Sequence, residues 1–272
     1  MILVTGANGN LGQATLAALR ARGVIATGGS RTPSAGMLRL DFDEPPGIDL
    51  AGVSTLVLIS AGYAEDDRVI ERHAAVLDAA ARDKVGHVVY TSLTGAGDHL
   101  GFALAHRATE RLLRAGDVPW TILRNGLYAE LFGGLLMWAQ DGVESAFGDG
   151  ALAAVAREDL AEAAAVIAAD PARHSGRTYD LVGTPITAAD VADRFAVPHR
   201  TIGLGEYRRR LHEMPGLLPF QPPMLASIAT CIRHGFLDGT GPDLADILGR
   251  PLRDPLAVAV ATAAATAPEA VR

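Results

Sequence analysis

A glycine-rich turn near residue 6 constrains the fold more than any other feature of the chain. An apolar run, Ile2 to Val4, leads through Thr5 into Gly6-Ala7-Asn8-Gly9-Asn10-Leu11-Gly12, and an alanine-rich amphipathic stretch follows. The first glycine allows a tight strand-to-helix turn, the second lets backbone N–H groups approach a pyrophosphate, and the third lets the helix pack closely on the strand. The helix N-terminus then offers unpaired N–H groups to phosphates. The alternative is a glycine-rich turn without a ligand.

The turn therefore predicts a dinucleotide-binding unit. The cofactor contacts expected from it are Gly6, Asn8, Gly9, Asn10, Leu11 and Gly12.

The end of the next β-like run indicates which dinucleotide is bound. Residues 24–29 lead into Ser30-Arg31-Thr32, and Arg31 stands nineteen positions after Gly12. An NAD site usually has an acidic side chain here that accepts from the ribose 2′-OH, whereas a guanidinium suits a 2′-phosphate. We therefore expect NADP(H), with hydroxyl contacts from Ser30 and Thr32. In the alternative, Arg31 is only a solvated surface charge.

Strand-like and helix-like segments alternate through the first half of the chain. This order is typical of a doubly wound, Rossmann-type parallel sheet of the α/β class, which we expect over residues 1–125. The expected strands are 2–5, 24–29, 37–40, 55–60, 87–92 and 120–124, and the expected helices are 11–22, 68–82 and 102–115.

The rhythm changes after Asn125. We expect a smaller, mostly helical lobe over residues 126–272 that covers the substrate, with later segments free to return to the sheet. Thr187 is the expected N-cap of one helix, because its hydroxyl can accept from a free backbone N–H. The expected helices are 130–140, 157–170, 187–195 and 256–267, with a turn at 148–150 and a strand at 178–182; beyond Ile202 we expect mostly helix with one or two short strands.

Composition excludes several classes of function. The 272 residues carry a net charge of −7, which lacks the basic footprint of a nucleic-acid-binding protein. A single cysteine, Cys231, rules out a disulfide framework, and histidines at metal-ligand spacing are absent. No apolar run approaches the length of a membrane span, and we identify no signal peptide. We therefore expect a cytoplasmic enzyme without a metal.

Several segments together resemble a known family. The turn at 5–12 is similar to the TGATGxLG turn of atypical short-chain dehydrogenases, especially the NmrA-like group, and 89–93 (Val-Tyr-Thr-Ser-Leu) resembles its YTSL strand end. Residues 123–130 resemble its LRNGWYSEN segment. Ile59-Ser60, followed downstream by residues 71–80, resemble its LIS…HRNVIDAA region. Residues 235–251 are similar to its closing segment, which ends in GRP. Within the family, the likeness points to NADPH-dependent quinone oxidoreductases of type 2.

The resemblance and the strand order together assign further cofactor contacts. Ligands of open α/β sheets bind at the carboxyl ends of the strands. The family places an aspartate after the third strand for the adenine amine, which implies Asp41 with Phe42 beside it; an ordinary turn carboxylate is the alternative. Residues expected near the ribose, the nicotinamide or the acceptor are Ser60, Ala61, Gly62, Thr91, Asn125, Tyr128 and Arg157.

The catalytic Tyr-x-x-x-Lys of ordinary short-chain dehydrogenases is missing. In the matching helix, Phe102 replaces the tyrosine and His106 replaces the lysine. Reduction of a quinone needs less acid–base help than oxidation of an alcohol, because the product is an aromatic hydroquinone. His106 is the best titratable candidate, with a structural histidine as the alternative. Ser92 and Tyr128 are further catalytic candidates, through contact with the nicotinamide or the substrate, and Tyr128 is alternatively a rim aromatic without such a contact. Arg157 alternatively pairs with Glu158 or Asp159.

We therefore expect an NADPH-dependent reductase of quinones or similar conjugated carbonyls. Two other functions stay open at this point: an NADP-binding redox sensor without turnover, and a biosynthetic reductase similar to isoflavone reductases. The expected partners are small molecules, not nucleic acid or membrane, and a homodimer is left open.

Overall fold

A seven-stranded parallel sheet forms the centre of the molecule. The computed structural model describes residues 1–61 and 64–268, and the strands lie in the order β10-β6-β5-β4-β1-β2-β3. Every neighbouring pair in this sheet is parallel. The strands are β1 (Ile2–Val4), β2 (Ala26–Ser30), β3 (Leu38–Arg39), β4 (Thr55–Ile59), β5 (His87–Leu93), β6 (Trp120–Asn125) and β10 (Thr178–Leu181).

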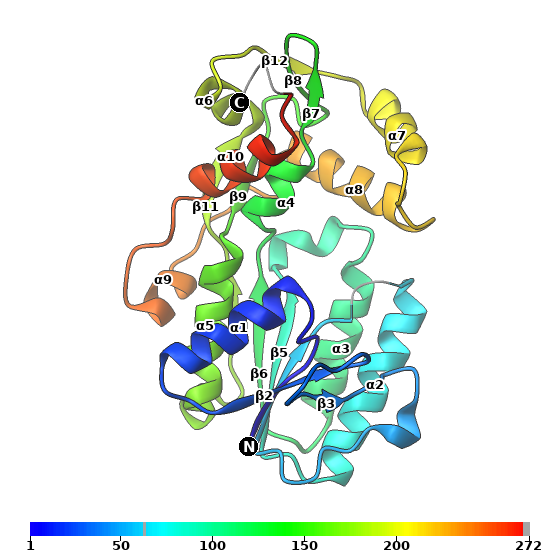
Figure 1. Ribbon diagram of the computed structural model, residues 1–272, viewed down its shortest axis with the longest axis vertical. Coiled ribbons are helices and arrows are strands. Elements are labelled where there is room, and N and C mark those ends of the chain that lie inside the picture. The colour runs from blue at the N-terminus through cyan, green and yellow to red at the C-terminus, as the bar shows by residue number, and fades with distance from the viewer. Residues whose placement is uncertain (62–63, 269–272) are drawn as a thin grey trace.

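Helices cover both faces of the sheet. In Figure 1, α1 (Asn10–Ala21) and α5 (Arg157–Ala169) lie on one side, and α2 (Asp66–Arg82) and α3 (Ala103–Ala115) lie on the other. Successive strand residues point to opposite faces. Val57 accordingly belongs to the core beneath α1 and α5, while Leu56 and Leu58 belong to the core beneath α2 and α3. The predicted doubly wound sheet is confirmed.

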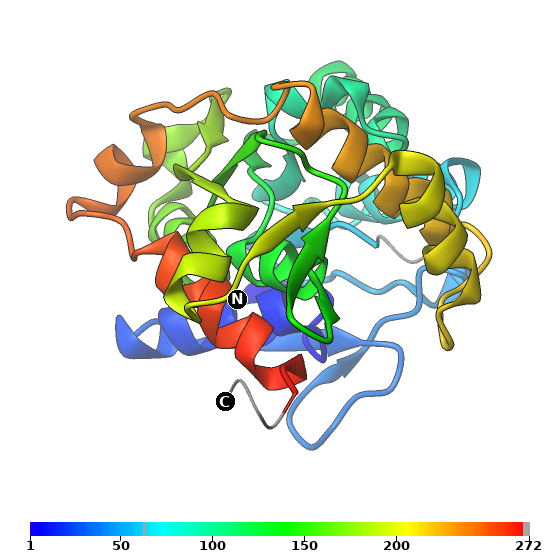
Figure 2. The same cartoon turned by 90° about the horizontal axis from the view of Figure 1, so that it is seen from above.

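A smaller lobe, with its own core, lies beyond the carboxyl ends of the strands (Figure 1). Its helices are α4 (Ala129–Gly134), α6 (Ala188–Arg194), α7 (Leu204–Glu213), α8 (Gln221–Arg233) and α10 (Pro255–Thr266). Its strands are β7 (Met137–Ala139), β8 (Gly142–Ser145), β9 (Ala151–Ala154), β11 (Thr184–Thr187) and β12 (His199–Thr201). Figures 1 and 2 both place α7 and α8 above the α2–α3 side of the sheet.

The chain crosses between the sheet and the lobe more than once. After the first lobe strands, α5 packs on α1 and β10 pairs with β6, and α9 (Asp243–Leu248) contacts both α5 and β10. Short 3₁₀ helices, η1 (Pro45–Gly47), η2 (Gly95–His99) and η3 (Pro171–His174), complete the connections. The division into two units at residue 125 stays a prediction.

The predicted helix over 130–140 is wrong in its second half. Helix α4 ends at Gly134, and Met137–Ala139 instead pairs antiparallel with β8. Two adjacent glycines weaken a helix, and Gly133 serves packing here, because a Cβ on it would lie 2.2 Å from the Ala259 carbonyl oxygen of α10. The other lobe strands were missed because each has only three or four residues.

Other local predictions are confirmed. Thr187 caps α6, accepting from the Asp190 N–H at 3.1 Å while the Asp190 carboxylate accepts from the Thr187 N–H at 2.8 Å. The turn at 148–150 and the helix near the carboxyl terminus are present. The predicted strands beyond Ile202 are absent from the described residues up to 268, which form α7 to α10 there.

Candidate functional site

The glycine turn has the geometry of a phosphate cradle. Gly6 has a φ of +61°, which favours glycine, and its carbonyl oxygen accepts from the Gly9 N–H at 2.8 Å. A Cβ on Gly12 would lie 2.3 Å from that same oxygen. Helix α1 begins after Gly9 without a side-chain cap and without an acidic residue in its first turn. The first N–H groups of α1 are therefore available to a pyrophosphate, and the turn fits a dinucleotide.

Asn8 ties this turn to the end of β2. Its Nδ2 donates to the Ser30 hydroxyl at 2.9 Å and to the Thr32 carbonyl oxygen at 2.8 Å. The exposed Arg31 lies between these two anchored residues, and within residues 1–61 and 64–268 its guanidinium has no ion pair. Arg39 of β3 donates to the Arg31 carbonyl oxygen at 3.3 Å and pairs with Glu44 at 3.0 Å. The segment that carries Arg31 is thus held from two sides, and its side chain is left available.

Asp41 and Phe42 follow β3 and are both half-buried. Asp41 Oδ1 accepts from the Asp43 N–H at 3.1 Å, as in the turns that aspartate commonly forms with its own backbone. Its other oxygen lies 3.9 Å from Arg39. Asp41 thus has the turn role given above as an alternative, and a contact with adenine stays a prediction.

Two sets of hydrogen bonds support the ends of β4 and β5. The Thr91 hydroxyl oxygen accepts from the Ser60 N–H at 3.2 Å, and His73 Nε2 accepts from the Ala61 N–H at 3.0 Å. His73 Nδ1 therefore carries the proton and donates to Thr109 Oγ1 at 2.8 Å, and Thr109 donates to a helix carbonyl. Burial, with His106 nearby, lowers the pKa of His73 to about 3. Gly62 lies outside the described residues.

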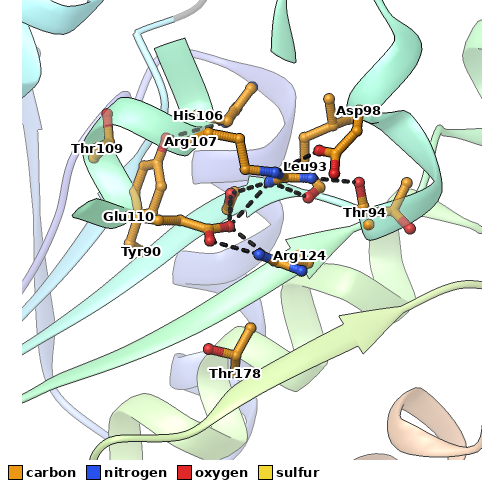
Figure 3. Close-up of polar contacts among 12 residues, drawn as sticks. Tyr90, Leu93, Thr94, Asp98, His106, Arg107, Thr109, Glu110, Arg124 and Thr178 are labelled. Carbon is orange, nitrogen blue, oxygen red and sulfur yellow. Dashed lines mark hydrogen bonds and ion pairs between the residues drawn. The ribbon is translucent and has the colours of Figure 1, made fainter. Parts of the chain in front are cut away.

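His106 is bound to a tyrosine that the sequence argument missed. Tyr90 of β5 is fully buried, and its hydroxyl lies 3.0 Å from His106 Nδ1 (Figure 3). Burial raises the pKa of the phenol above its ordinary value. Burial, and secondarily Arg107, lower the pKa of His106 to about 4. Both groups are therefore neutral at pH 7.

Glu110 organises the region around β5 and β6. Its carboxylate is 1% exposed and binds Arg107, Arg114 and Arg124 at 2.7–3.0 Å. Burial acts to raise the pKa of Glu110, but hydrogen bonds from Arg124 and Ser92 lower it to about 2. Figure 3 shows Glu110 between Arg107 and Arg124. A buried carboxylate needs such partners, because an unpaired buried charge is costly.

This network also fixes Ser92 and the loop after β5. The buried Ser92 hydroxyl donates to Glu110 at 2.7 Å. Arg107 donates to the carbonyl oxygens of Leu93 at 2.9 Å and Thr94 at 2.8 Å. The Ser92 hydroxyl is therefore engaged inside the protein, and its catalytic role stays a prediction that the mechanism below does not use.

Two buried polar atoms lack partners within the described residues, and they lie on neighbouring strand ends. They are Thr94 Oγ1 and Asn125 Oδ1, on side chains of residues that are 3% and 6% exposed. The Thr94 N–H donates to the Asn125 carbonyl oxygen at 2.9 Å, which places the two residues side by side. Buried polar atoms are normally hydrogen-bonded, and an exception calls for an explanation such as a ligand.

Tyr128 and Arg157 form a pair at the junction with the lobe. The Arg157 guanidinium lies 5.1 Å from the centre of the Tyr128 ring and 3.6 Å from the Glu130 carboxylate. Glu130 also accepts from the Arg157 N–H at 3.2 Å. The expected alternative partners of Arg157 were wrong, because Asp159 binds Arg250 and Arg253, and Glu158 binds Arg253. Contacts of Tyr128 and Arg157 with a ligand stay predictions.

The sequence contained a signal for some of the missed residues. Tyr90 alternates with Val89 and Thr91 along β5, so its side chain had to face α3 and His106. Glu110 and Arg107 lie on α3 three residues apart, a spacing at which helical side chains meet. Arg124 comes from strand β6, and no local pattern connects it to Glu110 and Arg107 on α3.

Neither a metal centre nor a membrane-spanning helix is found in the part of the chain that the structure describes. Among residues 1–61 and 64–268, no three His, Cys, Asp or Glu side chains gather in a way that would hold a metal ion. Within the same residues, none of the helices has both the length and the apolar character required to cross a bilayer.

Comparison with known proteins places the chain in a family, although no family model matches the sequence. Quinone oxidoreductase 2 of Escherichia coli (strain K12) is 32% identical over 204 residues, 67% of this chain and 68% of that protein. The NmrA-like family domain-containing oxidoreductase flvB of Aspergillus flavus is 32% identical over 155 residues, half of each chain.

Solved structures agree over almost the whole chain. The crystal structure of NADPH-dependent quinone oxidoreductase complexed with NADPH from E. coli has a TM-score of 0.82 at 26% identity, covering 98% of this chain and 100% of that chain. The triphenylmethane reductase of Citrobacter sp. complexed with NADP(H) has a TM-score of 0.84 at 27% identity, covering 96% and 99%. The chain thus belongs to the NmrA-like family of atypical short-chain dehydrogenases and reductases.

Proposed function

We propose that this protein is an NADPH-dependent reductase that transfers hydride to a quinone or a similar conjugated carbonyl acceptor. Relatives that are named quinone oxidoreductase and triphenylmethane reductase, solved with NADPH or NADP(H), support this activity. The turn at Gly6 to Gly12 supports the same cofactor, because its geometry leaves the N-terminus of α1 to a pyrophosphate.

Residues along the carboxyl ends of the strands would hold the dinucleotide. The turn binds the pyrophosphate, Arg31 binds the 2′-phosphate, and Asp41 and Phe42 lie beside the adenine. Ser60, Ala61 and Thr91 lie beside the ribose and the nicotinamide, and Tyr128 and Arg157 border the acceptor. When bound, the cofactor supplies the hydride, and the chain's own residues orient the two reactants.

The observation that carries the proposal is the unpartnered pair Thr94 and Asn125. Asn125 Oδ1 requires a donor, and the Thr94 hydroxyl can both donate and accept. A carboxamide has an N–H donor and an oxygen acceptor in one plane, so the carboxamide of a nicotinamide satisfies both residues. A quinone oxygen has lone pairs only, and it satisfies Thr94 alone. The pair therefore suits the nicotinamide end of the cofactor, with the acceptor stacked beside it.

The test is NADPH oxidation, followed by absorbance, with a panel of small and bulky quinones and a cationic triphenylmethane dye. Turnover with at least one acceptor class is expected. Tight NADPH binding without any turnover would contradict the reductase and favour a redox sensor. Activity confined to one bulky aromatic substrate would favour the biosynthetic alternative.

Two variants connect the activity to the site. Thr94→Val replaces an unpartnered hydroxyl with a methyl group, so the folded protein should be no less stable while NADPH affinity falls about tenfold, roughly one hydrogen bond. Asn125→Ala should lower NADPH affinity by the same factor, and it should also lower stability because it truncates a buried side chain. Thr184→Val, at an exposed position of β11, is the matched control and should change neither quantity. Unchanged NADPH affinity in both site variants would overturn the assignment.

A further inference from the structure

The contact between Tyr90 and His106 determines which ring nitrogen of His106 carries a proton. The Tyr90 ring is fully buried, and its hydroxyl lies 3.0 Å from His106 Nδ1, with the Ser60 and Thr109 hydroxyls also interacting with it. The neighbouring Thr109 hydroxyl accepts from His73 Nδ1 and donates to the Ala105 carbonyl oxygen. A buried phenol that keeps its proton needs an acceptor. His106 Nδ1, at 3.0 Å, is the acceptor in hydrogen-bond geometry with the phenol, and with the phenol donating to it Nδ1 is unprotonated.

The other nitrogen is then a free donor. A neutral imidazole has one N–H, and with Nδ1 accepting, the proton lies on Nε2. Within the described residues Nε2 has no hydrogen-bond partner, and it is not among the buried unpartnered atoms, so it is open to solvent or to a ligand. The half-buried ring lies near the rings of Tyr90 and Phe102, with centroid distances of 6.2 and 6.5 Å.

We propose that Tyr90 is a positioning residue that holds His106 as the neutral Nε2–H tautomer, and that this N–H donates a hydrogen bond to an oxygen of the bound ligand. The oxygen is either the carbonyl of the acceptor or a ribose hydroxyl of the cofactor, which present the same lone-pair chemistry. The identity of the ligand rests on the proposed function; the tautomer does not.

This arrangement makes His106 a hydrogen-bond donor and not a source of protons. If Nε2 gave up its proton, Nδ1 would have to take the Tyr90 proton and leave a buried phenolate, which burial strongly disfavours. A neutral imidazole can still polarise a carbonyl through its N–H. In the reduction, hydride adds to the acceptor, electron density moves onto its oxygen, and that oxygen takes its proton from water.

The charged and titratable groups around His106 leave it neutral over the working range of pH. Burial and, secondarily, Arg107 disfavour a second proton on the ring, and together they outweigh Glu110, which favours one. His73 from α2 stays neutral at pH 7 and above, because burial lowers its pKa to about 3. Tyr90 from β5 stays protonated.

The tautomer is measured directly by NMR of ¹⁵N-histidine-labelled protein without cofactor. The chain has eight histidines, so His106 is assigned by the signals that disappear in His106→Gln. The expected spectrum has a protonated Nε2 and an unprotonated Nδ1 from pH 5.5 to 8.5. Tyr90→Phe should shift His106 toward a mixture of tautomers, and Tyr207→Phe, at another fully buried tyrosine, should not. A protonated Nδ1 at pH 7, or no response to Tyr90→Phe, would overturn the proposal.

Kinetics and binding then identify the oxygen. If it belongs to the acceptor, His106→Leu, whose side chain has no donor, lowers kcat at least tenfold while the Kd for NADPH stays constant; if it is a ribose hydroxyl, that Kd rises at least tenfold. No change in either would overturn the donor role. The wild-type kcat should be independent of pH from 6 to 9. If kcat instead changed with pH in this range, and the change were absent in His106→Gln, the claim that His106 gives up no proton would be overturned. The NMR result stands without turnover, so failure of the reductase assignment and failure of the tautomer are separate outcomes.

Discussion

The carbonyl oxygen of Gly6 occupies the space that a Cβ on Gly12 would need. The two atoms would stand 2.3 Å apart, and the Gly6 carbonyl carbon would lie at 2.8 Å. This oxygen also accepts from the Gly9 N–H, which closes the turn. The third glycine of the turn is therefore required by the first, and the contact joins the turn after β1 to the start of α1.

Gly12→Ala should weaken both folding and cofactor binding. The added methyl group must displace backbone, so the free energy of unfolding should fall by about 1–3 kcal/mol and NADPH affinity should fall with it. Thermal unfolding and fluorescence titration with NADPH measure the two effects. Gly205→Ala in α7 is the control, because nothing lies within 4 Å of its Cβ position; it should be neutral or stabilising. If Gly12→Ala bound NADPH with wild-type affinity, the proposal that this turn binds the pyrophosphate would be contradicted.

Arg31→Ala should change which cofactor the protein prefers. A charged hydrogen bond to the 2′-phosphate is worth about 1.5–3 kcal/mol, so the Kd for NADPH should rise about 10- to 100-fold. The Kd for NADH should change little, because NADH lacks that phosphate. Arg173→Ala is the control, because it removes another exposed arginine far from the carboxyl ends of the strands: Arg173 lies in η3, just before β10 begins. It should leave the Kd values for NADPH and NADH unchanged. An equal loss for the two cofactors would defeat the assignment of Arg31.

Glu110→Gln should be among the most destabilising single changes in the protein. The substitution leaves Arg107, Arg114 and Arg124 without their shared carboxylate, and breaking a buried pair costs about 3–5 kcal/mol. Chemical denaturation measures the loss. Glu71→Gln is the control, since that carboxylate is 64% exposed and its ion pair among the described residues is with Arg68 alone, and such surface pairs contribute about 0–1 kcal/mol. Similar losses in the two variants would mean that the cluster is not stabilising.

The same carboxylate gives a dependence of stability on acid pH. The folded-state pKa of Glu110 is lowered from 4.5 to about 2, so between these values the unfolded chain binds a proton that the folded protein does not. The contribution of Glu110 is fully present above about pH 4.5 and is lost as the pH falls toward 2. The free energy of unfolding, measured at several pH values, should fall less steeply in this window for Glu110→Gln than for wild type.

Sequence patterns revealed the sheet because its strands are buried on both faces. Val57 and its neighbours in β4 form a continuous apolar run, which periodicity and flanking turns make easy to recognise. The strands of the lobe are short, and outside the β7–β8 hairpin they pair across long separations, as β12 does with β8, so local sequence carries little information about them. For the site, the ends of the predicted strands indicated which backbone positions lie close to a bound ligand. The partners of Ser92 and His106, which are Glu110 and Tyr90, depended on side-chain directions that only the folded packing sets.

Thr109→Val should loosen the support beneath the end of β4. The change preserves shape but removes the oxygen that accepts from His73 Nδ1 at 2.8 Å, leaving a buried N–H unsatisfied at a cost of about 1–3 kcal/mol. Since His73 in turn accepts from the Ala61 N–H, hydrogen exchange at Ala61 should also become faster. Thr230→Val is a matched control, because the exposed Thr230 donates to a helix carbonyl at the same 2.8 Å distance as Thr109 does. The stability of Thr230→Val should stay within about 0.5 kcal/mol of wild type. If Thr109→Val kept wild-type stability and wild-type hydrogen exchange at Ala61, the hydrogen bonds from Ala61 to Thr109 would not stabilise this edge of the sheet.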